Sequence, residues 1–177
     1  MKRCSAVVVI VVALSALCSC SAAAGPPVPA PPAAVVAVQP PGATGDVLVA
    51  YEQLRTLLAA DSVEGIGPIG TRLLTAAQIV AEKKGAGGAE VVAAVGPLSV
   101  VGVDLVKARQ AFGEISRGVV ALIAADKTLQ AGRFLFSCPM ARGYQRWVQT
   151  APKMANPYMG SRMLECGEAV AVWAVDG

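Results

Sequence analysis

Sulfur-bearing side chains are concentrated in one segment near the end of the sequence. Residues 138–167 read CPMARGYQRWVQTAPKMANPYMGSRMLECG. This segment contains every methionine except Met1 and every cysteine outside the N-terminal stretch: Cys138, Met140, Met154, Met159, Met163 and Cys166. Thiolate and thioether sulfur are soft ligands that select Cu(I) over hard cations. The segment is therefore a candidate soft-metal site.

The spacing of these residues allows their sulfur atoms to converge. If residues 159–166 form a helix, its two methionines and its cysteine lie on one face. If residues 136–140 are extended, the side chains of Cys138 and Met140 point in the same direction. An Asn-Pro pair at 156–157 is typical of a turn, which would bring the two groups together.

A disulfide is the alternative interpretation of the same residues. In an oxidising compartment two cysteines usually pair, and methionines mostly fill hydrophobic cores. A bridge between Cys138 and Cys166 would close a loop of about 28 residues and contribute roughly 3–4 kcal/mol in the chain-entropy model. The bridge would also remove both thiolates as ligands. The sequence leaves the two interpretations open.

Composition and charge argue against several other functions. The sequence has no histidine, which removes His-based catalytic triads and His-containing zinc sites. Ser137 has no base available to activate it, and Glu165 and Glu168 are typical of a solvated edge. The formal net charge is +3, and Lys2 and Arg3 account for two of the positive charges, so no basic surface for nucleic acid is predicted. We predict a protein that is not an enzyme.

The C-terminal motifs resemble those of domain-of-unknown-function family 3347. Its members are secreted or lipid-anchored bacterial proteins, and the domain also occurs as an extension of the periplasmic adaptor proteins of copper and silver efflux pumps. The matching motifs are Cys138-Pro139-Met140-Ala141, Trp147-Val148-Gln149, Asn156-Pro157-Tyr158, Gly160, Met163-Leu164 and Cys166-Gly167-Glu168. A looser match covers Tyr51, Leu54, Asp61, Ala108-Arg109, Phe112 and Ser116, and the whole resemblance spans about residues 46–172.

The resemblance implies a helical periplasmic domain that handles copper or another heavy metal. It carries over to Cys138, Met140, Met163 and Cys166 as ligands of Cu(I). It does not carry over to Met159, where the family pattern usually has an aromatic residue. The bound ion would be buffered or passed to a heavy-metal efflux adaptor protein.

Four segments predict helices that would support this site. Apolar residues recur at steps of three and four over 46–60, 69–84 and 98–125, and a short helix is expected at 89–95. The connections between these segments are short, with Gly85 as a stop signal. We therefore expect a mainly α fold, an antiparallel bundle of three to four helices.

The chain changes character after Gly132. Residues 134–137, FLFS, favour a strand, and residues 168–175 are its expected partner. A two-stranded ribbon is only marginally stable alone. It must pack against the helices, and the rings suited to that role are those of Tyr144, Trp147 and Tyr158.

The N-terminal stretch predicts export and lipid attachment. Lys2 and Arg3 precede an apolar run at 5–17, which is shorter than the roughly 20 residues that span a bilayer. Ser19-Cys20 resembles the end of a bacterial lipobox, so Cys20 is the predicted lipidation site. The alternative is an ordinary cleaved signal ending near residues 22–24.

The expected organisation is a signal at 1–20, a tether at 21–45 and a domain at 46–177. The tether holds seven of the twelve prolines and reads as an extended spacer. We expect a periplasmic protein anchored to the cell envelope by lipid. The outer membrane is favoured because the residue after Cys20 is not the Asp that retains some lipoproteins in the inner membrane. The two functional hypotheses are a Cu(I)-binding lipoprotein and a disulfide-stapled interaction module without metal.

Overall fold

The computed structural model describes residues 40–99 and 102–174 of the chain. The predicted signal, the lipidation site at Cys20 and the predicted tether up to residue 39 lie outside the described residues. Among the helices that are described, none combines the length and the apolar character needed to cross a membrane.

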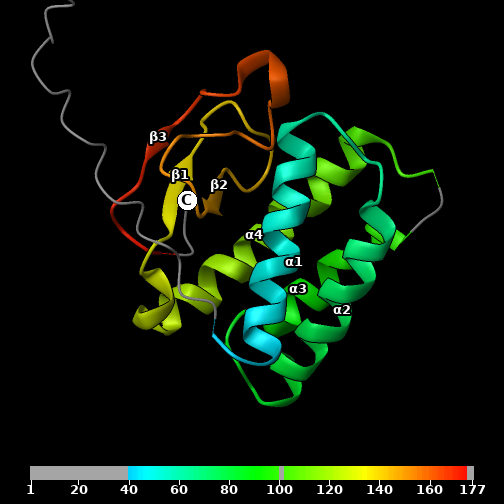
Figure 1. Ribbon diagram of the computed structural model, residues 1–177, viewed down its shortest axis with the longest axis vertical. Helices are drawn as coiled ribbons and strands as arrows, with labels where there is room; N and C mark the ends of the chain where they lie inside the picture. Colours follow the sequence, from blue (N-terminus) through cyan, green and yellow to red (C-terminus); the bar gives the residue numbers. More distant parts are fainter. Residues whose placement is uncertain (1–39, 100–101, 175–177) are drawn as a thin grey trace, which may run out of the picture. The chain divides into compact units, whose positions relative to one another are not determined.

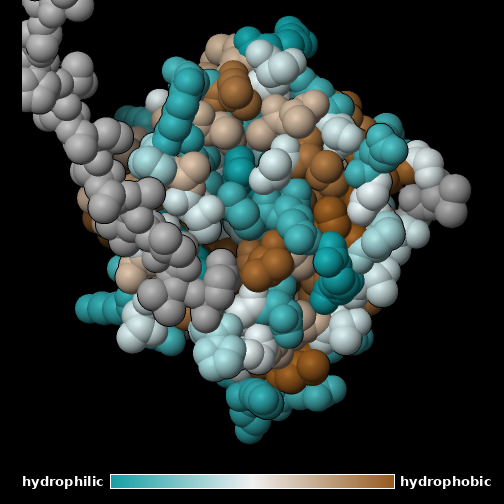
Figure 2. All heavy atoms as spheres, in the orientation of Figure 1, coloured by the Kyte–Doolittle hydropathy of each residue, from teal (hydrophilic) through white to brown (hydrophobic). Residues whose placement is uncertain are grey.

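The described chain is mainly helical, as the sequence predicts. Its α-helices are α1 (Ala43–Ala59), α2 (Ile66–Glu82), α3 (Gly88–Val95) and α4 (Leu105–Ala125). Each helix packs against the next along the chain, and α1 also packs against α4 (Figure 1). The core between them is built from fully buried apolar residues that include Leu54, Leu58, Leu73, Phe112 and Ile115. On the face seen in Figure 2, apolar residues show as several spots between hydrophilic ones.

None of the four helices begins at the predicted residue: α2 begins at Ile66 rather than at residue 69, and α3 at Gly88 rather than at residue 89. The helix α1 begins at Ala43, so the last residues of the predicted tether at 21–45 are helical. The helix α4 begins at Leu105 rather than at residue 98. A 3-10 turn at Gly96–Ser99 and the positive φ of 75° at Gly102 interrupt the expected helix. Asp104 then caps α4, because its carboxylate accepts a hydrogen bond from the Lys107 backbone N–H at 2.8 Å.

The close approach of α3 and α4 depends on a glycine. A Cβ atom at Gly118 would lie 2.8 Å from the backbone oxygen of Gly87 and 2.8 Å from the Val91 side chain. The helices therefore pack more closely than any larger residue at position 118 would allow. The periodicity of the sequence predicts both helices but not how close they lie.

The C-terminal half contains a three-stranded antiparallel sheet in place of the predicted ribbon. Its strands are β1 (Phe134–Ser137), β2 (Arg146–Gln149) and β3 (Glu168–Ala169), in the order β2-β1-β3. The predicted pairing of 134–137 with 168–175 is present only at residues 168–169. The strand β2 was not predicted, because four residues bounded by Arg and Gln are too short to show an alternating pattern. The sheet lies beside α1 and α4 (Figure 1).

Five aromatic rings in contact join the helices to the sheet. The ring of Tyr51 on α1 stacks on Phe112 of α4 at 5.2 Å, and Phe112 meets Tyr158 edge to face at 5.5 Å. Tyr158 in turn meets Trp147 at 6.0 Å, and Trp147 stacks on Phe136 of β1 at 5.5 Å. The prediction that Trp147 and Tyr158 pack the strands against the helices is confirmed.

Hydrogen bonds from polar groups at the same junction fix the sheet in place. The Tyr51 hydroxyl lies 2.7 Å from the Ser116 hydroxyl and accepts a hydrogen bond from the Val148 backbone N–H at 3.1 Å. The hydroxyls of Ser116 and Tyr158 both donate to the backbone oxygen of Arg146, at 2.9 and 2.8 Å. Burial raises the pKa of Tyr51 far above its ordinary value, so the phenol stays protonated. These bonds hold β2 against α1 and α4.

Candidate soft-metal site

The structure brings Cys138 and Cys166 together at the edge of the sheet. Their Sγ atoms are 3.6 Å apart, and both residues are free thiols. Cys138 directly follows β1 and is fully buried, whereas Cys166 lies two residues before β3 and is half-buried. The pairing of β1 with β3 therefore accounts for the meeting of two cysteines from opposite ends of the segment.

Met140 brings a third sulfur atom to this pair. Its Sδ atom lies 3.8 Å from the Cys166 Sγ, and the thiol donates toward the thioether. The turn after β1 places it there, since the Ala141 backbone N–H donates to the Cys138 oxygen at 3.0 Å. The Met140 side chain is 57% exposed. We refer to Cys138, Met140 and Cys166 as the sulfur cluster; it has a buried side at Cys138 and an open side at Met140.

Met163 lies near the cluster in sequence but forms no sulfur–sulfur contact of this kind within the described residues. The segment 159–166 is not an α-helix; it contains the short 3-10 helix η3 (Gly160–Met163). The predicted face shared by Met159, Met163 and Cys166 is therefore wrong. A 3-10 helix rotates each residue by a larger angle than an α-helix does, so residues four apart do not align. The Met163 side chain is 41% exposed.

A buried asparagine fixes the loop that carries Cys166. Asn156 is fully buried, and its side-chain amide donates to the Cys166 backbone oxygen at 2.6 Å. Its Oδ1 atom accepts from the backbone N–H groups of Tyr158 and Met159, at 2.8 and 3.1 Å. Its own backbone N–H donates to the Leu164 oxygen at 2.8 Å. The predicted turn at 156–157 is present, but the role of its asparagine in holding Cys166 was missed.

A second buried amide, that of Gln149, shapes the preceding loop. Its Oε1 atom accepts from the Trp147 indole N–H and from the Ala155 backbone N–H, both at 3.1 Å. Its Nε2 atom donates to the backbone oxygens of Ala151 and Lys153, at 2.7 and 2.6 Å. All the polar capacity of this fully buried side chain is thus used to close residues 150–155.

Gly167 allows the chain to pass close to β1 after Cys166. Its φ of 142° belongs to glycine, and a Cβ atom there would lie 2.6 Å from the Ser137 oxygen. The same Cβ would lie 3.1 Å from the Trp147 ring and 3.3 Å from the Met154 Sδ. Glycine at position 167 is therefore required by this close passage. The passage also places the Met154 thioether beside the residue that follows Cys166.

Hydrogen bonds to an ion pair of the helical half connect the η3 turn to the helices. Arg109 of α4 meets Asp61, in the turn after α1, with an N–O distance of 2.6 Å. The other oxygen of Asp61 accepts from the backbone N–H of Ser161 at 2.9 Å and from its hydroxyl. Arg109 also donates to the backbone oxygen of Pro157 at 2.8 Å. The Ser161 hydroxyl and the Arg109 guanidinium lower the pKa of Asp61 to about 2.

The geometry of the sulfur cluster suits two kinds of chemistry. A thiolate–metal bond is about 2.3 Å long, so in a trigonal site two sulfurs lie roughly 4 Å apart. The distances of 3.6 and 3.8 Å are close to that value. A disulfide has sulfurs about 2.05 Å apart, so oxidation requires Cys138 and Cys166 to approach by roughly 1.5 Å. The hydrogen bond between the thiols, with partial desolvation, raises the pKa of Cys166.

The neighbouring carboxylates are not positioned as ligands. Glu165 pairs with Lys153 at 2.9 Å. Within residues 40–99 and 102–174, no group of three or more His, Cys, Asp and Glu side chains could hold a metal ion. A metal site at the two cysteines therefore draws its further ligand from thioether sulfur.

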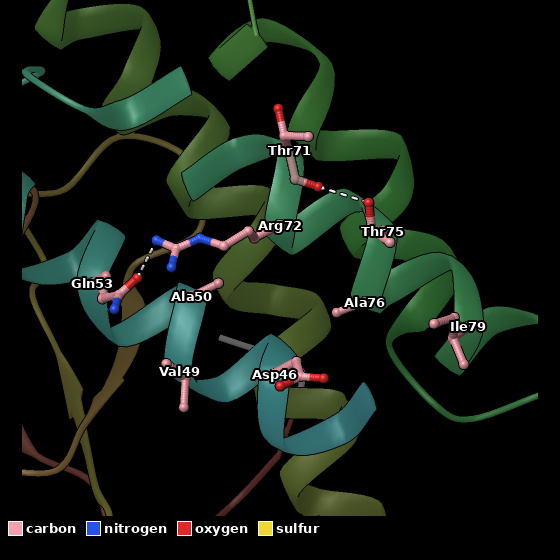
Figure 3. A pocket seen from close by; sticks show the side chains of 9 residues that line it. All are labelled: Asp46, Val49, Ala50, Gln53, Thr71, Arg72, Thr75, Ala76 and Ile79. Carbon is pink, nitrogen blue, oxygen red and sulfur yellow. Dashed lines mark hydrogen bonds between the residues drawn. The ribbon is translucent and has the colours of Figure 1, made fainter. Parts of the chain in front are cut away.

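The surface of the described domain has several hollows, one of which lies next to the sulfur cluster. A groove of about 340 Å³ runs between α1 and α2, and Figure 3 shows Val49 and Ile79 at its side with Arg72 donating to Gln53 at 2.6 Å. A pocket of about 430 Å³ lies next to the cluster and has Met140 in its wall. Met140 makes the second hollow part of the cluster's surroundings, whereas no residue of the cluster lines the groove between α1 and α2.

Comparison with models of known protein families, with curated proteins and with solved structures gives no match to this chain. The resemblance of the segment 138–168 to a family associated with copper efflux adaptors thus stays a prediction that depends on the motif residues alone.

Proposed function

We propose that this domain binds one soft metal ion, Cu(I), at the sulfur cluster. The observation that carries the proposal is the gathering of Cys138, Cys166 and Met140, with successive sulfur distances of 3.6 and 3.8 Å. Two thiolates and a thioether form a donor set that favours Cu(I) over hard cations. Met163 is the fourth ligand in this proposal, joining from the exposed η3 turn.

The surroundings of the cluster support an ion that enters and leaves. Cys138 is fully buried, so the protein around it holds this ligand in place. Met140 is more exposed and leaves the cluster accessible from outside. A carrier needs such an open side, because a closed site would retain the ion. The proposed role is therefore to buffer the ion or to deliver it to a heavy-metal efflux adaptor. The four helices would form the antiparallel bundle that supports the site.

The proposed setting is the periplasm. The chain would be attached to the cell envelope, with the outer membrane favoured, by lipid on Cys20, and the proline-rich residues would act as a spacer. The proposal includes no catalytic step.

The second candidate function is an interaction module stapled by a Cys138–Cys166 disulfide. The Sγ–Sγ distance of 3.6 Å favours it as well, because a small rotation of the side chains would bring the sulfurs to bonding distance. The staple and the metal site exclude each other, since the disulfide uses both thiolates.

One pair of measurements separates these functions. Free thiols are counted in the unfolded, non-reduced protein, and the reduced protein is then titrated anaerobically with Cu(I) against a chromophoric chelator. Free thiols together with tight one-to-one binding support the metal site. Absence of free thiols together with no retained copper supports the staple and overturns the proposal.

Variants then test the ligands. Cys138→Ser and Cys166→Ser should each abolish tight binding, and the double variant Met140→Leu with Met163→Leu should weaken it while leaving the fold intact, since the volumes are similar. Met159→Leu is the matched control, because the family pattern usually has an aromatic residue at this position and the proposal gives Met159 no role as a ligand. Unchanged Cu(I) affinity in the double variant would remove methionine from the proposed site.

A further inference from the structure

The pocket beside the sulfur cluster combines exposed apolar and cationic side chains. Its walls come from the start of α4, the connection between β1 and β2, and the segment around η3. Val106 and Met140, which are 67% and 57% exposed, are among the most exposed large apolar side chains of the described domain. Arg142 and Arg162 lie in the same pocket and are also exposed. Apolar side chains of this kind beside arginines are typical of protein interaction sites.

The charges around this pocket are not balanced. Three carboxylates on the surrounding segments each have a cation of their own: Asp61 with Arg109, Asp104 with Lys107, and Glu165 with Lys153. Within the described part of the chain, neither Arg142 nor Arg162 takes part in any of these ion pairs. The pocket thus presents two positive charges that the domain does not neutralise.

The chemistry of the pocket indicates its ligand. A guanidinium binds a carboxylate through two parallel hydrogen bonds, which makes arginine suited to recognising Asp and Glu side chains. Binding to an anionic membrane uses clusters of about four to eight basic residues, and this pocket has two free ones. A short acidic segment of a protein fits both the number of charges and the apolar side chains between them.

We propose that this pocket binds a carboxylate-bearing segment of a partner protein, which then lies against Met140 on the open side of the sulfur cluster. The purpose of this docking rests on the proposed function, because the partner would exchange the soft ion through Met140. The binding of carboxylates itself does not depend on metal. Charge complementarity of this kind sets partner choice and the rate of association more than it sets affinity.

The test uses the reduced, metal-free protein and two labelled peptides. One peptide carries a run of glutamates and the other carries glutamines in their place. We expect the glutamate peptide to bind at least about tenfold more tightly, and to lose that advantage as salt is added. The double variant Arg142→Gln with Arg162→Gln should lower its affinity at least about tenfold. Equal binding of the two peptides, or no loss in the variant, overturns the proposal.

Two controls sharpen this experiment. Arg72→Gln removes one positive charge at the groove between α1 and α2, as each of the single variants Arg142→Gln and Arg162→Gln does at the pocket. It should leave peptide binding unchanged; a loss as large as in those single variants would show a non-specific charge effect and overturn the proposal. Vesicles of phosphatidylcholine with about one-third phosphatidylglycerol present the competing ligand. If the protein prefers these vesicles to the peptide, and the arginine double variant loses that binding, the pocket recognises lipid headgroups. That result would overturn the proposal of a partner protein.

Copper titration of the arginine double variant separates this proposal from the proposed function. Unchanged Cu(I) affinity with lost peptide binding is the expected result, since neither arginine is a ligand. Peptide binding by a protein that retains no copper would leave the pocket in place and remove the metal site. Copper binding by a protein that does not recognise the peptide would support the metal site and overturn the docking proposal.

Discussion

The helical half of this domain and its C-terminal half are stabilised in different ways. Between the helices, contact is made by apolar side chains such as Leu54, Leu73 and Ile115, all fully buried. Around the sulfur cluster, the loops are held by hydrogen bonds from Asn156 and Gln149 to backbone groups. Apolar packing adds up over many contacts, whereas each buried amide makes several directional bonds.

This difference predicts different results of mutation. Loss of an apolar side chain from the helical core should lower stability while leaving the sulfur atoms where they are in the molecules that remain folded. Loss of a buried amide should cost less stability but should move a ligand. The binding of Cu(I) per folded molecule is therefore the property that tells the two halves apart.

The largest expected effect is that of Phe112→Ala. Phe112 is fully buried, and its ring lies between those of Tyr51 and Tyr158. Its removal should lower the free energy of unfolding by about 3–5 kcal/mol, through lost burial and the cavity that remains. Urea denaturation of the reduced protein measures the change. Cu(I) affinity, measured well below the denaturation midpoint, should stay within about twofold of the wild type, and a larger loss would show that the two halves are not independent.

Asn156→Ala should have a smaller effect on stability and a larger one on the site. Its side chain makes three hydrogen bonds, and the substitution leaves the Cys166 oxygen and two backbone N–H groups without their partner. We expect a loss of about 2–3 kcal/mol together with weaker Cu(I) binding and slower formation of the Cys138–Cys166 disulfide. Asn156→Asp separates the bonds, because its Oδ1 can still accept both N–H groups while the donation to the Cys166 oxygen is lost, so Cu(I) binding should weaken here as well. Wild-type copper affinity in the alanine variant would contradict the positioning role of Asn156.

The same difference explains what the sequence could predict. A helix repeats its apolar residues, so the three longer helices were predicted mainly from periodicity. The interruption before Leu105 was missed because a glycine of positive φ and a capping aspartate outweigh apolar periodicity locally. The roles of Asn156 and Asp61 could not be read from spacing, since each depends on partners far along the chain. The Asn-Pro pair did indicate a turn, and that turn is where the buried amide lies.

For the cluster, sequence reasoning brought the two cysteines together by a different route from the real one. It placed Cys166 on a helix that does not exist, whereas the pairing of β1 with β3 brings the thiols together. Met140 was predicted from alternation along an extended segment at 136–140, but β1 ends at Ser137 and it is the following turn that places the Met140 sulfur beside Cys166. The charged pocket was not predicted, because Arg142 and Arg162 converge only through the fold.

The smallest expected effect concerns the Asp61–Arg109 ion pair of the helical half, which is hydrogen-bonded to Ser161 and Pro157 of the C-terminal half. The pKa of Asp61 is lowered to about 2, first by the Ser161 hydroxyl and then by Arg109. A carboxylate with a lowered pKa contributes its full stabilisation above its ordinary pKa of 3.8 and loses it as pH falls toward 2. We expect the free energy of unfolding of the wild type, measured by urea denaturation, to fall more between pH 5 and pH 2 than that of Asp61→Asn. The difference should be less than about 1 kcal/mol, since water screens an exposed pair. If the two proteins show the same pH dependence, Asp61 does not stabilise the contact between the η3 turn and the helices in solution. The two halves would then be stabilised separately, with no contribution from this carboxylate.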